Sequence, residues 1–185
     1  MRALSENLRR RSIRLPAYDY SQAGAYFVTI CTLNRECLFG KVMDGKVQLN
    51  PFGCVVEEEW LKTAELRPCI ELGTSVVMPN HFHGIIVIND ECRGTARRAP
   101  TVSRFGKPVA GALSTVIRSF KSAVTKRIND LRRTPGNVVW QRNYYEHIIR
   151  NEDDWKKIHD YIVYNPEKWM VDAENPDRIN RKLGL

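Results

Sequence analysis

Two histidines with one residue between them, His81 and His83, lie inside an apolar run that extends from Thr74 to Ile88. In a β-strand, residues two positions apart project from the same face. The run therefore predicts a strand that presents both imidazole rings on one side of a sheet. Two imidazoles placed in this way can supply nitrogen ligands to one metal ion. From the spacing alone, two histidines that only form hydrogen bonds are an equally good interpretation.

The other local patterns predict alternating strands and helices. Strands are predicted at 26–32, 71–78 and 81–88, a hairpin around Asp44-Gly45, and an extended segment within 138–149. Helices are predicted at 54–66, at 113–131 and from the N-cap Asn151 to about Tyr164, the first with Val55, Val56, Trp60 and Leu61 facing inward. This order predicts an α+β fold, a ferredoxin-like antiparallel sheet with helices packed on one face.

A chain of 185 residues is expected to form one domain. We predict a basic arm at 1–20, a domain at 21–169 that includes a basic loop at 89–111, and a C-terminal tail at 170–185. The arginines of the arm either contact DNA or only increase solubility. No apolar run approaches the ~18 residues that span a bilayer, and the N-terminus lacks a secretory signal. We therefore expect a cytoplasmic protein without a membrane partner, and the basic character of the chain adds an expected association with the nucleoid.

The positive charge is concentrated in one part of the chain. The net charge is +8 and the isoelectric point is about 9.4, which favours a nucleic acid as partner ahead of an acidic membrane. From Arg93 to Arg133 there are eleven lysines and arginines, and Asp130 is the single acidic residue of that stretch. A helix surface that is merely solvated usually carries both signs. Contact with a phosphate backbone is therefore the better explanation.

Basic and aromatic side chains in and after this region are the candidate DNA contacts. They are Arg97, Arg98, Arg118, Lys121, Lys126, Arg127, Trp140, Arg142 and Tyr144. Aromatic rings beside arginine suit stacking on unpaired bases. Core packing is the competing explanation for Trp140. Tyr144 and Tyr145 are adjacent, so in an extended segment only one of them can face the core.

The last predicted helix carries a possible nucleophile. Tyr161 and Asn165 are four residues apart and therefore share one face. A phenol oxygen at Tyr161 could attack a phosphodiester, while Asn165 supplies an oxygen ligand to a metal ion held by the two histidines. A mixed nitrogen and oxygen site of this kind suits Mg²⁺ or Mn²⁺. A tyrosine that only anchors the helix to the core is the alternative.

Three blocks of sequence resemble the REP-associated tyrosine transposases, a branch of the single-tyrosine transposases with a His-hydrophobic-His (HUH) signature. The blocks are 78–84 (MPNHFHG), 140–150 (WQRNYYEHIIR) and 160–166 (DYIVYNP). The resemblance covers roughly residues 15–169. It implies the HUH endonuclease fold, with His81, His83 and Asn165 as metal ligands and Tyr161 as the nucleophile.

The resemblance also implies an activity. Members of this family cut single-stranded DNA near imperfect palindromes, forming a 5′-phosphotyrosine and a free 3′-OH that can be rejoined without ATP. The implied partner is a single-stranded DNA hairpin of a repetitive extragenic palindrome, and the implied cofactor is Mg²⁺ or Mn²⁺. The protein could act as a monomer or as a homodimer.

The sequence departs from compact members of the family in its longer basic segment at about 90–111, so DNA contacts cannot be transferred to it. Tyr164 is a second candidate nucleophile, but it lies farther from the apolar helix stripe than Tyr161. Two other functions remain open. A non-catalytic nucleic-acid-binding protein would not need the histidines and Tyr161 to converge, and a metal-dependent hydrolase would need the histidines without the tyrosine.

Overall fold

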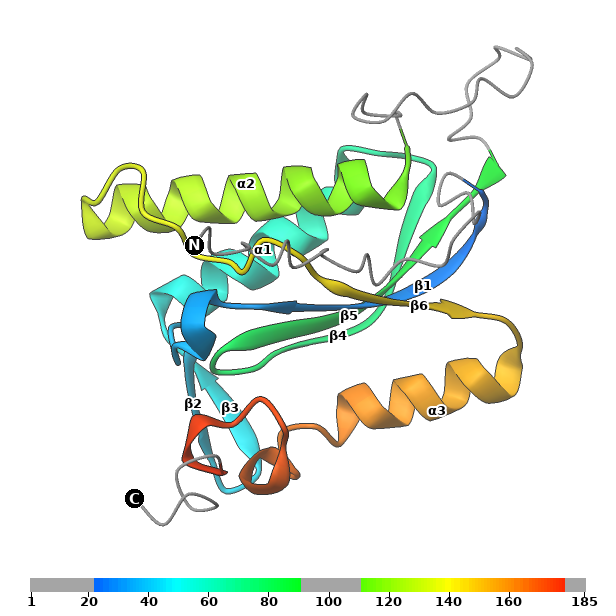
Figure 1. The fold of residues 1–185 in the computed structure, drawn as a ribbon. Coiled ribbons are helices and arrows are strands. Elements are labelled where there is room, and N and C mark those ends of the chain that lie inside the picture. Colours follow the sequence, from blue (N-terminus) through cyan, green and yellow to red (C-terminus); the bar gives the residue numbers. More distant parts are fainter. Residues whose placement is uncertain (1–21, 91–110, 179–185) are drawn as a thin grey trace, which may run out of the picture.

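A four-stranded antiparallel sheet in the order β4-β5-β1-β6 forms the centre of the molecule (Figure 1). The computed structural model describes residues 22–90 and 111–178. The strands are β1 (Gly24–Cys31), β2 (Gly40–Met43), β3 (Lys46–Leu49), β4 (Ile70–Val77), β5 (His81–Ile88) and β6 (Tyr145–Ile149). The helices are α1 (Pro51–Glu65), α2 (Leu113–Arg132) and α3 (Glu152–Val163), with 3-10 turns η1 (Leu33–Arg35) and η3 (Trp169–Val171). The predicted α+β class with a ferredoxin-like antiparallel sheet is confirmed.

Local sequence signals account for several element ends. Asp44 and Gly45 both have positive φ, 52° and 70°, as a tight hairpin turn between β2 and β3 requires. The Asn50 side chain accepts hydrogen bonds from the first turn of α1, and Pro51 follows it at the first helical position. The Asn151 side chain caps α3 in the same way, by accepting from Asp154 N. The capped ends explain why α1 begins three residues earlier than its apolar pattern predicts.

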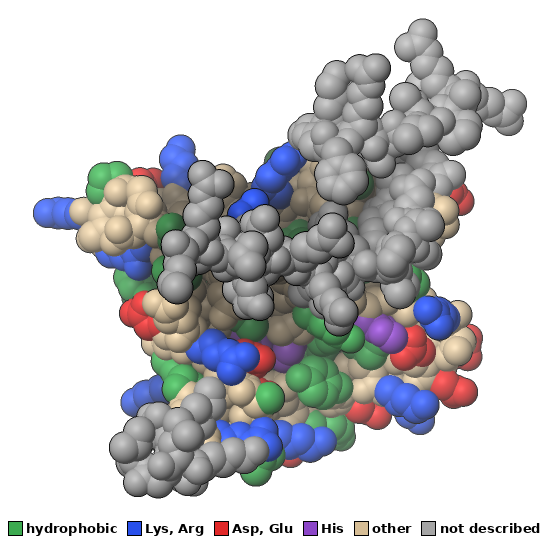
Figure 2. Space-filling view, in the orientation of Figure 1, with side chains coloured by type: hydrophobic (Ala, Val, Ile, Leu, Met, Phe, Trp, Pro, Cys, Tyr) green, Lys and Arg blue, Asp and Glu red, His purple; other side chains and the backbone are tan. Residues whose placement is uncertain are grey.

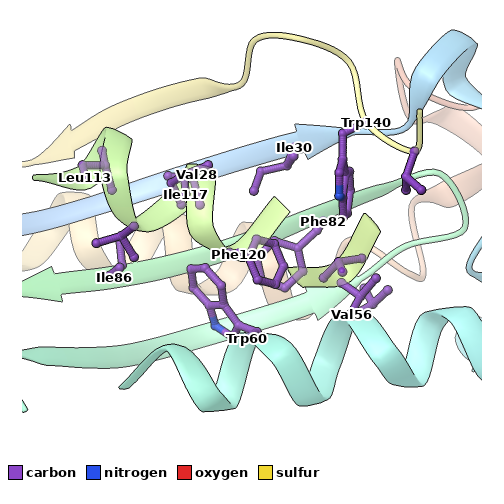
Figure 3. Close-up of a cluster of buried hydrophobic side chains, with 14 of the residues drawn as sticks. Val28, Ile30, Val56, Trp60, Phe82, Ile86, Leu113, Ile117, Phe120 and Trp140 are labelled. Atoms are coloured by element: carbon purple, nitrogen blue, oxygen red, sulfur yellow. The ribbon is translucent and has the colours of Figure 1, made fainter. Parts of the chain in front are cut away.

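The larger core lies between the sheet and the pair α1 and α2. One face of the sheet contributes Tyr26, Val28, Ile30, Phe82, Ile86 and Ile88, and the helices contribute Val56, Trp60, Leu113, Val116, Ile117 and Phe120. Figure 3 shows the rings of Trp60, Phe82 and Phe120 gathered between the strands and these helices. The predicted inward stripe of α1 is wrong at Leu61, which is 56% exposed.

The opposite face of the sheet is covered by α3. Phe27, Ile85 and Ile149 form a second apolar cluster there with Ile162, and Trp155 and Ile158 pack against it. The helices therefore cover both faces of the sheet, as Figure 1 shows, and the prediction of one covered face is wrong. The physical reason is that both sets of alternate residues in β1 and β5 are largely apolar, so each face needs a cover.

The described part of the predicted tail, residues 170–178, contacts the folded body. The backbone oxygen of Glu174 accepts a hydrogen bond from Asn80, its carboxylate pairs with Arg35, and Asn175 is buried. These residues of the predicted tail therefore pack on the folded body, because their polar groups bind Arg35 and Asn80 at the ends of the central strands β1 and β5. The arm at 1–20, Arg97, Arg98, most of the loop at 89–111 and residues 179–185 lie outside the described residues. None of the described helices combines the length and apolar character of a membrane span.

Candidate active site

The two histidines of β5 lie on the face of the sheet that α3 covers. Their ring centroids are 4.5 Å apart, and both side chains are almost fully buried. The Nδ1 atom of His83 is 2.8 Å from Thr29 Oγ1 on the neighbouring strand, and Nδ1 of His81 is 2.8 Å from Asn80 Oδ1. Each ring is therefore held through Nδ1, which leaves its Nε2 atom for another partner.

Burial makes both rings poor bases. It lowers the pKa of His81 to about 4, although the nearby Asp172 carboxylate and Asn165 amide oppose this shift. It also lowers the pKa of His83 well below its usual value, and positive charge on His81 adds to the effect. Both imidazoles are therefore neutral at pH 7. A neutral imidazole has one nitrogen lone pair, which is the form that binds a metal ion.

Tyr161 of α3 lies directly against this pair. Its Oη atom is 3.4 Å from His83 Nε2, and its ring packs edge-on against the rings of Phe27 and His83. Burial raises the pKa of the phenol, Asp172 adds to the shift and Asn165 opposes it. The hydroxyl is thus protonated at neutral pH and needs activation to act as a nucleophile.

Asn165 follows α3 and is buried beside the same groups. Its Nδ2 atom donates a hydrogen bond to Asp172 Oδ2 at 3.3 Å, whereas its Oδ1 atom is buried without a hydrogen-bond partner. His81 Nε2 is also buried without a partner. Buried polar atoms in this state are uncommon and point to a ligand that completes them.

The donor set fits a divalent metal ion. His81 Nε2, His83 Nε2 and Asn165 Oδ1 are two nitrogen donors and one oxygen donor from the site. Within residues 22–90 and 111–178, no group of three or more His, Cys, Asp or Glu side chains is placed to hold a metal. A site formed by these residues would therefore depend on the amide oxygen as its third ligand.

A cleft of about 770 Å³ opens beside these side chains. Its walls come from β1, β5, β6, α3 and the C-terminal segment, and they include Phe27, Thr29, His83, Tyr145, His147, Ile158, Tyr161, Asn165, Lys168 and Asp172. Tyr164 is absent from the described residues that line it. Figure 2 shows exposed hydrophobic side chains next to histidine on this side of the molecule, with acidic and basic side chains around them. Tyr161 lines this cleft and is 44% exposed, so its ring is accessible from solvent.

The predicted DNA contacts on α2 lie across the sheet from Tyr161, because α2 packs on the other face (Figure 1). Arg118, Lys126 and Arg142 are exposed. The Lys121 ammonium instead donates to the backbone oxygens of Gln141 and Arg142, at 2.6 and 3.1 Å. Arg127 forms ion pairs with Glu58 and Glu59 of α1. The charges of Lys121 and Arg127 are therefore engaged within the protein, which sequence spacing did not indicate.

The aromatic candidates for DNA contacts differ in their burial. Trp140 is 4% exposed and packs in the larger core against Phe39 and Phe120, so its predicted stacking role is wrong and core packing is the correct alternative. Tyr144 packs against that core, whereas Tyr145 is 49% exposed and lines the cleft. The alternation expected of an extended segment is therefore present, and the exposed ring is Tyr145, which the prediction omitted.

Sequence reasoning missed the outer contacts of the site. Thr29 faces His83 because the two residues are directly paired across β1 and β5. Asn80 precedes His81 in the chain, and its place in the turn was the only signal for it. Asp172 and Glu174 reach the site from a segment that was expected to be a tail, so no local pattern could have identified them.

No family model matches the chain. A Haemophilus influenzae protein described as uncharacterized is 40% identical over 166 residues, which is 88% of this chain and 91% of that protein. A putative REP-associated tyrosine transposase of the same organism is 23% identical over 150 residues, 81% of this chain and 74% of that protein. The chain is therefore similar in sequence to a member of the REP-associated tyrosine transposase family.

A solved structure supports the fold of this family. The structure of a REP-associated tyrosine transposase bound to a REP hairpin has a TM-score of 0.54 with 23% identity, over 80% of this chain and 68% of that one. The likeness confirms the HUH fold for the chain.

Proposed function

We propose that the chain is a metal-dependent endonuclease and strand transferase that acts on single-stranded DNA next to a hairpin repeat. The observation that carries the proposal is the position of Tyr161 Oη, 3.4 Å from His83 Nε2, beside two buried atoms without partners. A non-catalytic DNA-binding protein would have no need for this convergence. The relative bound to a REP hairpin makes a hairpin repeat the substrate to test first.

In the proposed reaction, Tyr161 Oη attacks the phosphorus of the scissile phosphodiester. The new bond is a 5′-phosphotyrosine, and the bond from phosphorus to the 3′ oxygen breaks. The phenolic proton is lost and the leaving oxygen gains a proton, so the released strand ends in a 3′-OH. Attack of a 3′-OH on the phosphotyrosine reverses these changes and rejoins DNA.

The other residues would hold the reacting groups. His81, His83 and Asn165 would bind Mg²⁺ or Mn²⁺, which when bound polarises a phosphate oxygen and offsets developing negative charge. Phe27 packs against the Tyr161 ring and limits its motion. Exposed Arg118, Lys126 and Arg142 would contact phosphates away from the cleft. Tyr145, exposed in the cleft, could stack on an unpaired base.

A covalent adduct tests the proposal. The protein is incubated with Mn²⁺ and a labelled single-stranded oligonucleotide that carries a hairpin, and complexes are resolved in SDS. We expect an SDS-resistant adduct with the wild type and with Tyr164→Phe, and a loss of at least about 100-fold with Tyr161→Phe, because Tyr161 is the tyrosine whose oxygen lies beside the two histidines.

Other outcomes would contradict the assignment. An adduct that survives Tyr161→Phe and disappears in Tyr164→Phe would move the nucleophile to Tyr164. Cleavage without an adduct would favour a hydrolase that uses water. Binding of the hairpin without cleavage would favour a non-catalytic binding protein.

A further inference from the structure

Asn80, the last residue before β5, is buried with both ends of its amide engaged. It is 1% exposed, and its Nδ2 atom donates to the backbone oxygens of Arg35 and Glu174, at 3.0 and 2.7 Å. A backbone carbonyl can only accept a hydrogen bond, so these two oxygens determine which end of the amide is the NH₂ group. The other end, Oδ1, must then be the atom that lies 2.8 Å from His81 Nδ1.

This orientation decides where His81 carries its proton. An amide oxygen has no hydrogen to give, so Nδ1 of His81 must be the donor of the hydrogen bond. A neutral imidazole carries one N–H, and Nε2 is therefore left with the lone pair. The Nε2 atom is buried without a hydrogen-bond partner beside Asn165 Oδ1, which also has none. The Asn80 amide thus directs the lone pair of His81 into the site.

The partner of the second histidine cannot have this effect. His83 Nδ1 lies 2.8 Å from the hydroxyl of Thr29, and a hydroxyl can either donate or accept. The ring of His83 can therefore exchange tautomers without losing that hydrogen bond. Of the two histidines, only His81 has its tautomer determined by a neighbouring atom, Asn80 Oδ1, that can accept a hydrogen bond but cannot donate one.

We infer that Asn80 is a positioning residue of the metal site: by accepting from Nδ1 of His81, it fixes the tautomer whose Nε2 atom can bind the ion. The metal-binding part of this inference rests on the proposed function, whereas the tautomer does not. The C-terminal segment takes part, because the Glu174 carbonyl is one of the two groups that orient the amide. The groups that support a metal ligand in this way typically change affinity by about 10–100-fold when removed.

The tautomer is read directly by long-range ¹H–¹⁵N NMR of the histidine rings in the metal-free protein. We expect the wild type to carry the His81 proton on Nδ1, and Asn80→Ala to lose this preference. Asn80→Asp keeps an acceptor at the same place but cannot donate to the two carbonyls, so it should keep the tautomer while losing stability. A purely structural role would predict that both variants behave alike.

Mn²⁺ affinity, measured by electron paramagnetic resonance without DNA, provides the second readout. We expect Asn80→Ala to bind Mn²⁺ about 10–100-fold more weakly than the wild type. Asn129→Ala is the matched control, because Asn129 is also buried and donates to a backbone oxygen but lies on α2, across the sheet. It should leave Mn²⁺ affinity unchanged, and thermal unfolding confirms that each variant is folded.

Two results would overturn the inference. One is a wild-type His81 that carries its proton on Nε2, and the other is an Asn80→Ala variant with both the wild-type tautomer and the wild-type Mn²⁺ affinity. If Mn²⁺ binding is lost in His81→Ala, while Asn80→Ala keeps both Mn²⁺ binding and the wild-type tautomer, the inference fails and the proposed metal site stands. If the wild type binds no Mn²⁺, the proposed site and the metal role of Asn80 both fail, and the NMR result alone decides whether Asn80 orients His81.

Discussion

Asp172 orients the side-chain amide of Asn165, the third proposed metal ligand. Its carboxylate accepts from Asn165 Nδ2 at 3.3 Å, which turns the amide so that Oδ1 faces away from Asp172 and stays without a partner. We expect Asp172→Ala to release this amide and to weaken Mn²⁺ binding about tenfold, as measured by electron paramagnetic resonance. Asp172→Asn keeps an acceptor oxygen and should lose less.

The matched control for charge is Asp177→Ala, which removes one carboxylate from an exposed position in the same segment. It should leave the affinity for Mn²⁺ unchanged. Equal losses in Asp172→Ala and Asp177→Ala would mean that net charge, and not the orientation of Asn165, controls binding.

At the scale of residues, the periodicity of strands and helices determined which site residues could be predicted from the sequence. The i, i+2 spacing placed His81 and His83 on one face, and the i, i+4 spacing placed Tyr161 and Asn165 on one side of a helix end. Asp172 could not be found in this way, because its contribution depends on how the chain turns back after α3. Lys121 was also unpredictable, since its carbonyl partners come from a different segment.

At the scale of elements, two helices on opposite faces of the sheet both begin with an asparagine N-cap. Asn50 caps α1 and Asn151 caps α3, each by accepting from backbone N–H groups of the first turn. Replacing such a cap by alanine typically costs about 1 kcal/mol. We expect both Asn50→Ala and Asn151→Ala to lower the free energy of unfolding in urea titrations, and Asn50→Ala by more, because Asn50 Nδ2 also donates to Leu38 O at 2.9 Å.

The two caps should differ in their effect on the proposed reaction. Only α3 carries Tyr161, so fraying of its first turn should loosen the helix on the sheet and reduce the rate of adduct formation several-fold. Asn50→Ala, with at least as large a stability loss, should react at close to the wild-type rate. The comparison fails if both variants lose adduct formation in proportion to their stability, because α3 would then have no special role.

The ends of these elements were predictable, because caps and turns depend on a few neighbouring residues in the sequence. The face of the sheet that each helix covers was not predictable. β1 is apolar on both sides, with Val28 facing α1 and α2 and Phe27 facing α3. A pattern of this kind states that a strand is buried but not which helix covers which side. The α3 helix has an amphipathic stripe that either face could have accepted.

At the scale of the whole molecule, the sheet separates the basic helix from the proposed nucleophile. The exposed Arg118 and Lys126 lie on α2, and Tyr161 lies beneath the other face (Figure 1). The segment of residues 133–144 joins α2 to the edge strand β6. Arg142 in this segment lines a groove with Lys126, and Tyr145 at the start of β6 lines the cleft of Tyr161. We expect a DNA molecule that contacts both regions to pass around the β6 edge.

Two neighbouring basic residues of α2 test this path. Lys126 is exposed and lines a groove of about 500 Å³ with Arg142, whereas Arg127 is held by Glu58 and Glu59. Fluorescence anisotropy with a hairpin oligonucleotide at several KCl concentrations measures the slope of log K against log salt. A lysine that contacts phosphate contributes about 0.9 to this slope, so Lys126→Ala should reduce it by about that amount. Arg127→Ala also removes one positive charge, but Glu58 and Glu59 already neutralise that charge within the protein. The salt slope of this variant should therefore stay close to that of the wild type. Equal reductions in both variants would show that overall charge, and not a DNA path along this groove, determines binding.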